Sequence, residues 1–308
     1  MIELLIDRNI HGNNSFIQSK TFTTYSFKHL SFPFYLSEND CVLNCKFFTL
    51  VTYDLLTEYK EIAHFCTDRE GGASVGNYAS FNMSPFSGDN QEDYTKNKSV
   101  LCDQLGIASD KIIIPYQTHG TEILEIDSHF IHLTEIDKAQ SLYGIDALIT
   151  RLPGVCIGIT TADCVPLIFF DPQKQVIAVA HAGWRGTCGR IGEKTIQVLM
   201  NRYQSNPADI RVVIGPSISP KVYEIGEEVV DNFKRAGFDI LSILSTRNKS
   251  IYLDLWKANQ LSLENTGVLS EHIETSGICT FTEHERFFSA RRLGIKSGRM
   301  LSGIMLIG

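Results

Sequence analysis

The sequence lacks the patterns that mark membrane proteins and nucleic-acid-binding proteins. Its longest apolar runs, such as VPLIFF at residues 165–170, are far shorter than the ~20 residues that a membrane-spanning helix needs. It has no long basic run, and its 308 residues carry a formal net charge of −7, which argues against nucleic acid or an anionic membrane as the main partner. It also has no internal repeat and no low-complexity linker.

The patterns of disulfide-rich and secreted proteins are missing as well. The eight cysteines include no Cys-x-x-Cys pair, so a zinc ribbon or a thioredoxin-type site has no support. The first residues, MIELLIDRNIHGNN, have no basic start, and Asp7 and Arg8 interrupt the apolar stretch, which is unlike a signal peptide. We therefore expect a cytoplasmic protein whose cysteines are free thiols or metal ligands.

The residues that are present indicate a globular α+β protein. Apolar residues make up 43% of the chain, enough for a sizeable core. Short apolar runs predict strands at residues 146–150, 155–160, 165–170 and 176–183. The last two are joined only by DPQKQ, which is too short for a crossover helix and indicates a hairpin. The pattern therefore favours mixed or antiparallel sheets over a doubly wound parallel sheet.

Helices are expected between and after these strands. One covers residues 89–106 and ends at Gly106, and another follows Gly186, with Ile196, Leu199, Met200 and Tyr203 on one face. Two more are expected near residues 227–236 and from Asp254 to Gly267. The chain ends in two strand-like runs, ICTF at residues 278–281 and SGIMLIG at residues 302–308.

Three residues stand out at the ends of predicted strands, beside turn residues. His119 lies in QTHGT, Cys164 in TTADCVP and His181 in HAGWRGT. Polar residues at such loop positions are more often functional than core residues are. Two imidazoles and one thiolate suit zinc or copper, and three protein ligands leave a fourth tetrahedral position open. The same residues also permit a cysteine hydrolase with Cys164 as nucleophile and His181 as base.

Longer motifs in the chain resemble the YfiH-like family, formerly named for polyphenol oxidoreductase (laccase-domain) activity and now described as purine nucleoside phosphorylase. The motifs, in order, are HFCTDREGGASVGNYASFNMS, QTHG, TTADCVPLIFFDP, HAGWRGT, GPSISPKVYEIG and FFSARRLGIKSGRM. The resemblance covers about residues 47–308, which we expect to form the catalytic domain. Residues 1–46 fall outside the resemblance and form an N-terminal extension of unknown role.

The resemblance implies a single α/β/β/α layered domain with mixed β-sheets. It implies a zinc ion bound by His119, Cys164 and His181. It implies phosphorolysis of adenosine, inosine, guanosine and methylthioadenosine, and deamination of adenosine. Arg69 and Asn82 match family positions near the substrate. The sequence departs from the family pattern by placing Asp68 before Arg69, and by having serine, proline and lysine at residues 219–221 where cysteine-containing versions are common.

Two further residues receive roles from their chemistry. Arg69 is the candidate for binding phosphate, because a guanidinium can hold two phosphate oxygens at once. Asp163, next to Cys164, is the candidate proton carrier in deamination, or else a residue that orients a metal ligand through a hydrogen bond. The expected partners are purine nucleosides and phosphate; the oligomeric state is not predicted.

Two alternatives remain besides the cysteine hydrolase. A copper-binding polyphenol oxidase would need the His-x-His pairs of a trinuclear cluster, and the nine histidines include none. A metal-stabilised binding protein without turnover would need no further residues. We therefore expect zinc, with copper as a less favoured occupant, and measurement of metal content together with nucleoside turnover separates the alternatives.

Overall fold

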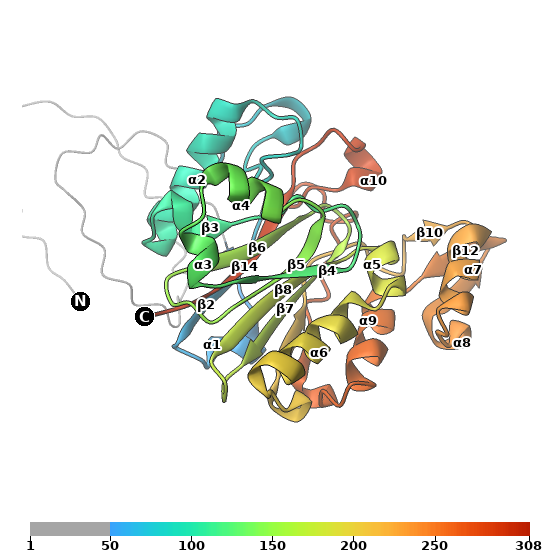
Figure 1. The fold of residues 1–308 in the computed structure, drawn as a ribbon. Helices are drawn as coiled ribbons and strands as arrows, with labels where there is room; N and C mark the ends of the chain where they lie inside the picture. Colours follow the sequence, from blue (N-terminus) through green and yellow to red (C-terminus); the bar gives the residue numbers. More distant parts are fainter. Residues whose placement is uncertain (1–49) are drawn as a thin grey trace, which may run out of the picture. The chain divides into compact units, whose positions relative to one another are not determined.

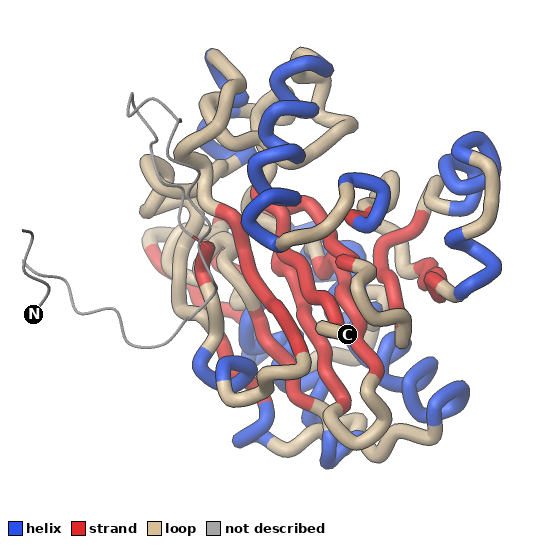
Figure 2. Tube along the Cα trace, turned by 90° about the vertical axis from the view of Figure 1, so that its left-hand side faces the viewer, coloured by secondary structure: helices blue, strands red, loops and turns tan. Residues whose placement is uncertain are grey.

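A computed structural model describes residues 50–308, which lie in one compact unit. The extension predicted at residues 1–46 lies outside the described residues, and the proposed boundary between residues 46 and 47 stays a prediction. The unit contains two large β-sheets and a small antiparallel one, with helices on the outer faces of the large sheets (Figures 1 and 2).

Both large sheets are mixed, as expected. The five-stranded sheet has the order β1 (Leu50–Val51), β2 (Ile62–Thr67), β14 (Met300–Leu306), β6 (Cys156–Thr161) and β3 (Ile112–Ile113). The six-stranded sheet has the order β13 (Ile273–Thr275), β9 (Arg211–Ile214), β7 (Val165–Asp171), β8 (Val176–Ala182), β5 (Ile145–Thr150) and β4 (Glu122–Ile126). Parallel pairs occur at the sheet edges, and the remaining pairs, including the β7–β8 hairpin, are antiparallel.

The small sheet has the order β10 (Glu224–Ile225), β12 (Ser250–Leu253) and β11 (Leu244–Arg247). The helices are α1 (Asp54–Thr57), α2 (Gln91–Leu105), α3 (Ser128–Ile131), α4 (Glu135–Ser141), α5 (Trp184–Cys188), α6 (Ile191–Tyr203), α7 (Glu227–Arg235), α8 (Ile240–Ile243), α9 (Leu255–Glu264) and α10 (Ala290–Leu293). Short 3-10 turns cover Gly76–Tyr78, Ser109–Lys111, Pro207–Asp209 and Ser270–His272.

Two helix boundaries follow directly from their capping residues. Helix α2 ends at Gly106, which has the left-handed conformation that glycine adopts readily. Helix α9 begins after Asp254, whose carboxylate accepts a hydrogen bond from the backbone N–H of Lys257. Both boundaries were predicted from the sequence.

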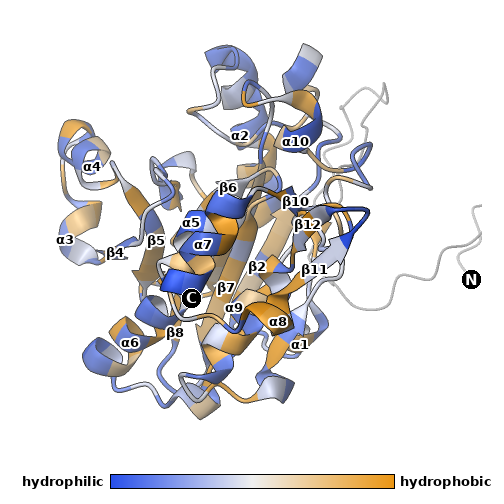
Figure 3. Cartoon of the chain, turned by 90° about the vertical axis from the view of Figure 1, so that its right-hand side faces the viewer, coloured by the Kyte–Doolittle hydropathy of each residue, from blue (hydrophilic) through white to orange (hydrophobic). Residues whose placement is uncertain are grey.

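The layering follows from the alternation of side chains along the strands. On β7, Leu167 and Phe169 face the helices α6 and α9, whereas Ile168 and Phe170 face the five-stranded sheet. On the outer face of the five-stranded sheet, Leu301 of β14 packs in a cluster with residues of α2. In Figure 3, β7 is largely orange while α7 carries both blue and orange bands, as a buried strand and a surface helix should. The expected order of layers, α/β/β/α, is confirmed.

Two local expectations are wrong. Met200 is 40% exposed although Ile196 and Leu199 are fully buried. Each step along α6 rotates the side-chain direction by about 100°, so Met200, one residue after Leu199, lies at the edge of the buried face. Residues 278–281 form no strand; Cys279 makes only an isolated bridge to Ser217. Within residues 50–308, the helices are too short or too polar to cross a membrane.

Candidate active site

The antiparallel pairing of β7 and β8 brings Cys164 and His181 together. In this register Pro166 lies opposite His181, so Cys164, just before β7, is at the end of β8. The two strands form a hairpin, so the start of β7 and the end of β8 must lie at the same edge of the sheet. This explains how residues 17 positions apart in the sequence reach one site.

The strands β5 and β4 extend the same edge. Ala147 of β5 lies opposite Ala180 of β8, so Asp146 is at the level of His181. β4 runs parallel to β5, which places the loop before β4 at this edge, and that loop carries His119. Four strand ends therefore converge on one place, and three of them carry the predicted metal ligands.

His119, Cys164 and His181 form a group that could hold a metal ion. One nitrogen or sulfur ligand atom from each lies within 4.8 Å of those of the other two, and the imidazole centroids of the two histidines are 4.8 Å apart with an angle of 73° between the rings. His119 is exposed, Cys164 is partly buried and His181 is buried. The group thus reaches from the interior to solvent on the side of His119. Its donor atoms, two imidazole nitrogens and a thiolate, fit zinc or copper.

The carboxylate of Asp146 lies behind this group and was missed by the sequence analysis. Asp146 is fully buried and forms a 2.8 Å hydrogen bond with Nδ1 of His181. It also accepts hydrogen bonds from the backbone N–H groups of Thr118, His119 and Gly120, at 3.2, 3.1 and 2.7 Å. The available signal was a charged residue inside an apolar strand, IDALIT, where a carboxylate is rarely found without partners.

The charges within the group shift its pKa values in a consistent way. Burial opposes ionisation of Cys164, but the charge of His181 and hydrogen bonds from both histidines lower its pKa to about 6. Burial also disfavours the charged form of His181, yet Cys164 and Asp146 raise its pKa to about 9. The pKa of Asp146 is lowered, because hydrogen bonds outweigh burial. Cys164 is therefore a thiolate at neutral pH, the form that binds metals and reacts as a nucleophile.

The backbone around the ligands leaves little space for other side chains. A Cβ atom placed on Gly183 would lie 2.8 Å from Sγ of Cys164 and 3.5 Å from the ring of His119. His119 and Asp163 both have positive φ angles, 63° and 85°, which non-glycine residues adopt rarely. The glycine after His181 and Ala182 is thus required by the position of the thiol.

Asp163 connects the site to the C-terminal loops. Its Oδ1 accepts a hydrogen bond from the hydroxyl of Thr280 at 2.8 Å, and its Oδ2 accepts from the hydroxyl of Ser289 at 3.0 Å and the backbone N–H of Arg291 at 2.7 Å. Its carbonyl oxygen accepts from the N–H of Ile218. These bonds hold the residue before Cys164 in place; the predicted part in proton transfer stays a prediction.

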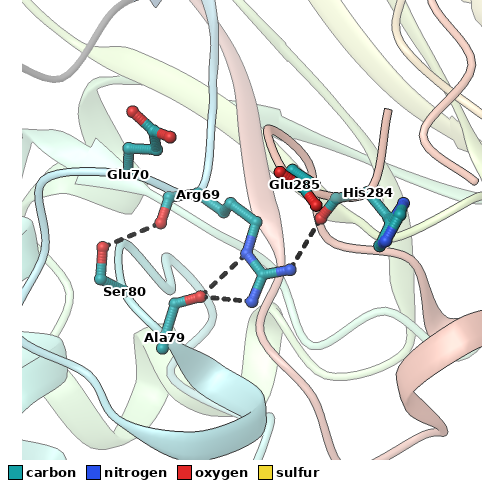
Figure 4. Close-up of a pocket in the computed structure, with 6 residues that line it drawn as sticks. All are labelled: Arg69, Glu70, Ala79, Ser80, His284 and Glu285. Atoms are coloured by element: carbon teal, nitrogen blue, oxygen red, sulfur yellow. Dashed lines mark hydrogen bonds between the residues drawn. The ribbon is translucent and has the colours of Figure 1, made fainter. Parts of the chain in front are cut away.

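Arg69 lies in a pocket of about 390 Å³ that is also lined by Glu70, Ala79, Ser80, His284 and Glu285 (Figure 4). Its guanidinium donates from Nε and Nη2 to the carbonyl oxygen of Ala79, at 2.9 and 2.7 Å, and from Nη1 to that of His284, at 2.8 Å. Arg69 thereby joins two loops that are far apart in the sequence. Its predicted contact with phosphate is not tested by this geometry.

Asn82 is fully buried within its own loop. Its Oδ1 accepts hydrogen bonds from the N–H groups of Ser84 and Arg299, at 3.1 and 2.9 Å. Its Nδ2 donates to Ser84, Ser87 and Asp89. The amide thus fixes the loop against the residues that precede β14, and its predicted contact with substrate stays a prediction.

The chain is similar to several known proteins along most of its length. A family model described as multi-copper polyphenol oxidoreductase laccase matches residues 63–307. A purine nucleoside phosphorylase of Bacteroides thetaiotaomicron is 43% identical over 259 residues, which are 83% of this chain and 96% of that protein. Adenosine deaminase RL5, from an unknown prokaryotic organism, is 38% identical over 254 residues, which are 82% of this chain and 96% of the relative.

Solved structures resemble the fold to a similar extent. The crystal structure of YlmD from Geobacillus stearothermophilus superposes with a TM-score of 0.76 at 33% identity, covering 81% of this chain and 93% of YlmD. The hypothetical protein YfiH of Bacillus licheniformis also gives a TM-score of 0.76, at 30% identity, covering 82% of this chain and 95% of YfiH.

Proposed function

The chain belongs to the family described as multi-copper polyphenol oxidoreductase laccase, and from this membership and the site we propose that it is a zinc-dependent purine nucleoside phosphorylase that also deaminates adenosine. The predicted resemblance to the YfiH-like family is confirmed. The prediction of an enzyme is confirmed too, because relatives named as a phosphorylase and a deaminase each match about four fifths of the chain.

The observation that supports the proposal most is the arrangement of His119, Cys164 and His181. Three ligand atoms within 4.8 Å of one another, from strand ends on one sheet edge, suit a tetrahedral ion with one open position. When bound, zinc would supply a Lewis acid at that position. The exposed side of His119 gives a nucleoside and phosphate access to it. The proposed substrates are adenosine, inosine, guanosine and methylthioadenosine.

The test pairs metal analysis with turnover. Protein from zinc-supplemented growth should hold about one zinc per chain and convert inosine and phosphate to hypoxanthine and ribose 1-phosphate. His119→Ala and Cys164→Ala should each lose both zinc and turnover, because each removes one of three ligands. His129→Ala, which removes an exposed histidine outside the ligand group, is the matched control. Full activity in metal-free protein would reject the proposal.

The cysteine hydrolase remains the second candidate, because the pKa of about 6 makes Cys164 a nucleophile even without metal. The two candidates differ in what they require of His119. A nucleophile needs His181 as its base, and loss of His119 removes only a hydrogen bond that helps to lower the pKa of Cys164, whereas a metal site needs both histidines as ligands. Turnover of His119→Ala at the wild-type rate, without bound metal, would favour the hydrolase.

Laccase chemistry is not proposed, although the family description names it. Among residues 50–308, the potential metal ligands form one group of three. A multicopper oxidase needs a trinuclear cluster in addition to its electron-accepting copper, and one group of three residues is too few for both. Copper in the same group would be a substitute occupant.

The predicted role of Arg69 in binding phosphate has its own test. Because the guanidinium also holds the carbonyl oxygens of Ala79 and His284, Arg69→Ala should lower the melting temperature as well as phosphate affinity. Arg69→Lys keeps the charge but cannot form these paired bonds. We expect the KM for phosphate to rise by about tenfold or more in Arg69→Ala beyond any effect on stability. An unchanged KM in both variants would assign Arg69 to loop structure alone.

A further inference from the structure

We propose that Asp146 is a positioning residue that sets both histidine ligands at once: it selects the tautomer of His181 and holds the turn that carries His119. The proposal rests on the proposed function insofar as those histidines bind a metal. It assigns a role to a residue that carries none in the motifs described above. Its evidence is the division of four hydrogen bonds between the two carboxylate oxygens.

The two oxygens of Asp146 have different partners. Oδ1 accepts from Nδ1 of His181 at 2.8 Å and from the N–H of His119 at 3.1 Å. Oδ2 accepts from the N–H groups of Gly120 and Thr118, at 2.7 and 3.2 Å. One oxygen therefore links the two metal ligands directly, and the other fixes the residues on either side of His119.

The bond to His181 decides which ring nitrogen can bind a metal. An ionised carboxylate can only accept hydrogen bonds, so Nδ1 of His181 must carry the proton. Nε2 then has the free electron pair, and it is the nitrogen that remains for the ligand group. Carboxylate partners of this kind fix the ring orientation and raise the basicity of metal-binding histidines.

The bonds to the turn decide where the other ligand lies. His119 has a φ angle of 63°, a conformation that an L-residue keeps only when its surroundings enforce it. Three consecutive N–H groups aimed at one carboxylate supply that enforcement. Asp146 is fully buried, and its ion-pair partner within residues 50–308 is His181. These four donors are what allows a buried carboxylate there.

Asparagine at this position cannot satisfy the same partners in either orientation. With its NH2 group at the place of Oδ2, two donors face the N–H groups of Thr118 and Gly120. With NH2 at the place of Oδ1, His181 must accept at Nδ1, which moves its proton to Nε2 and blocks metal binding there. In both cases one histidine ligand is displaced or disabled, although the side chain has almost the same shape.

Thr150 offers a matched control on the same strand. It is fully buried near the opposite end of β5, and its hydroxyl donates to the carbonyl oxygen of Ile126 and accepts from the N–H of Leu152. Thr150→Val removes buried hydrogen bonds of β5 without touching the turn or His181. It therefore reports what a general loss of strand stability does to the site.

The experiment measures the tautomer and the metal affinity separately. In metal-free wild-type protein labelled with ¹⁵N-histidine, at a pH where the ring of His181 is neutral, the ring nitrogens should show a protonated Nδ1 and a free Nε2. In chelator competition, Asp146→Asn should bind zinc about 10- to 100-fold more weakly than wild type, as loss of a histidine's partner does elsewhere. Thr150→Val should lower the melting temperature and leave zinc affinity unchanged.

The outcomes distinguish this proposal from the proposed function. A wild-type His181 protonated at Nε2, or equal zinc affinity in Asp146→Asn and wild type, overturns the role of Asp146. An equal loss of zinc affinity in Thr150→Val and Asp146→Asn also overturns the role of Asp146. Wild-type protein with the expected tautomer and tight zinc binding, but without phosphorolysis, supports the role of Asp146 and rejects the proposed function. The wild-type measurement needs no variant to fold.

Discussion

Two pairs of histidine and cysteine in this molecule have pKa values that are shifted in opposite directions. On β2, burial lowers the pKa of His64 to about 4 and raises that of Cys66 to about 12. At the strand ends, burial acts on Cys164 and His181 in the same sense, yet their pKa values move the other way, to about 6 and about 9. The residue types are the same, so the difference lies in their neighbours.

The groups around each pair explain the direction of its pKa shifts. Nε2 of His64 accepts a hydrogen bond from the N–H of Tyr53, while its buried Nδ1 has no hydrogen-bond partner among residues 50–308, so no acceptor there stabilises a positive charge on the ring. At the site, Asp146 stabilises the charge on His181, and both histidines stabilise the thiolate. Burial therefore keeps His64 and Cys66 neutral, whereas the opposite charges of Cys164 and His181, supported by hydrogen bonds from His119 and to Asp146, make the strand-end pair ionic.

The largest expected contrast is in alkylation. In metal-free protein at pH 7, a pKa of about 6 leaves Cys164 about nine-tenths ionised, whereas a pKa of about 12 leaves roughly one Cys66 in 10⁵ as thiolate. Iodoacetamide should therefore modify Cys164 at least about 100-fold faster, as measured by peptide mass spectrometry, because its larger thiolate fraction outweighs the lower nucleophilicity of a low-pKa thiolate and Cys66 is fully buried. Zinc should protect Cys164 until a chelator is added. Similar rates at both cysteines in folded protein would remove the basis of the comparison.

Acid should destabilise the protein by protonating His64 on β2. Because the folded pKa of His64 lies below its unfolded value of about 6.5, the unfolded chain binds the proton first, and stability falls as the pH drops from about 6.5 to about 4. The loss should reach about 3 kcal/mol and level off below pH 4. Urea unfolding at pH 7 and pH 4.5 measures it, with His64→Gln as the comparison. An equal acid loss in that variant would assign the effect to other groups.

Substitution of two glycines by alanine tests whether the packing of the site and the packing of β2 are independent. Gly183→Ala places a methyl group 2.8 Å from Sγ of Cys164 and should weaken zinc binding about tenfold. Gly303→Ala places one 2.7 Å from the ring of Phe65, beside β2, and should lower stability by about 1–3 kcal/mol without changing zinc affinity. Zinc competition and thermal melts distinguish the two effects. Weaker zinc binding in Gly303→Ala would show that the regions are not independent.

Several elements of the fold, including the hairpin that carries the site, were predictable because their signals are local. Gly106 ends α2, Asp254 begins α9, and the short DPQKQ link makes the β7–β8 hairpin. Where the signal depended on the surroundings, prediction failed. Met200 lies at the edge of the buried face of α6, and the apolar run around Cys279 packs without forming a strand.

By itself, the sequence determined which residues could bind a metal and which family the chain resembles. His119, Cys164 and His181 each follow or precede an apolar run beside small or turn residues, and that pattern is readable without coordinates. The tertiary structure alone decided that Asp146, 35 residues before His181, joins them. Strand register sets that contact, and register arises from the packing of both faces of a sheet, which no stretch of one strand contains.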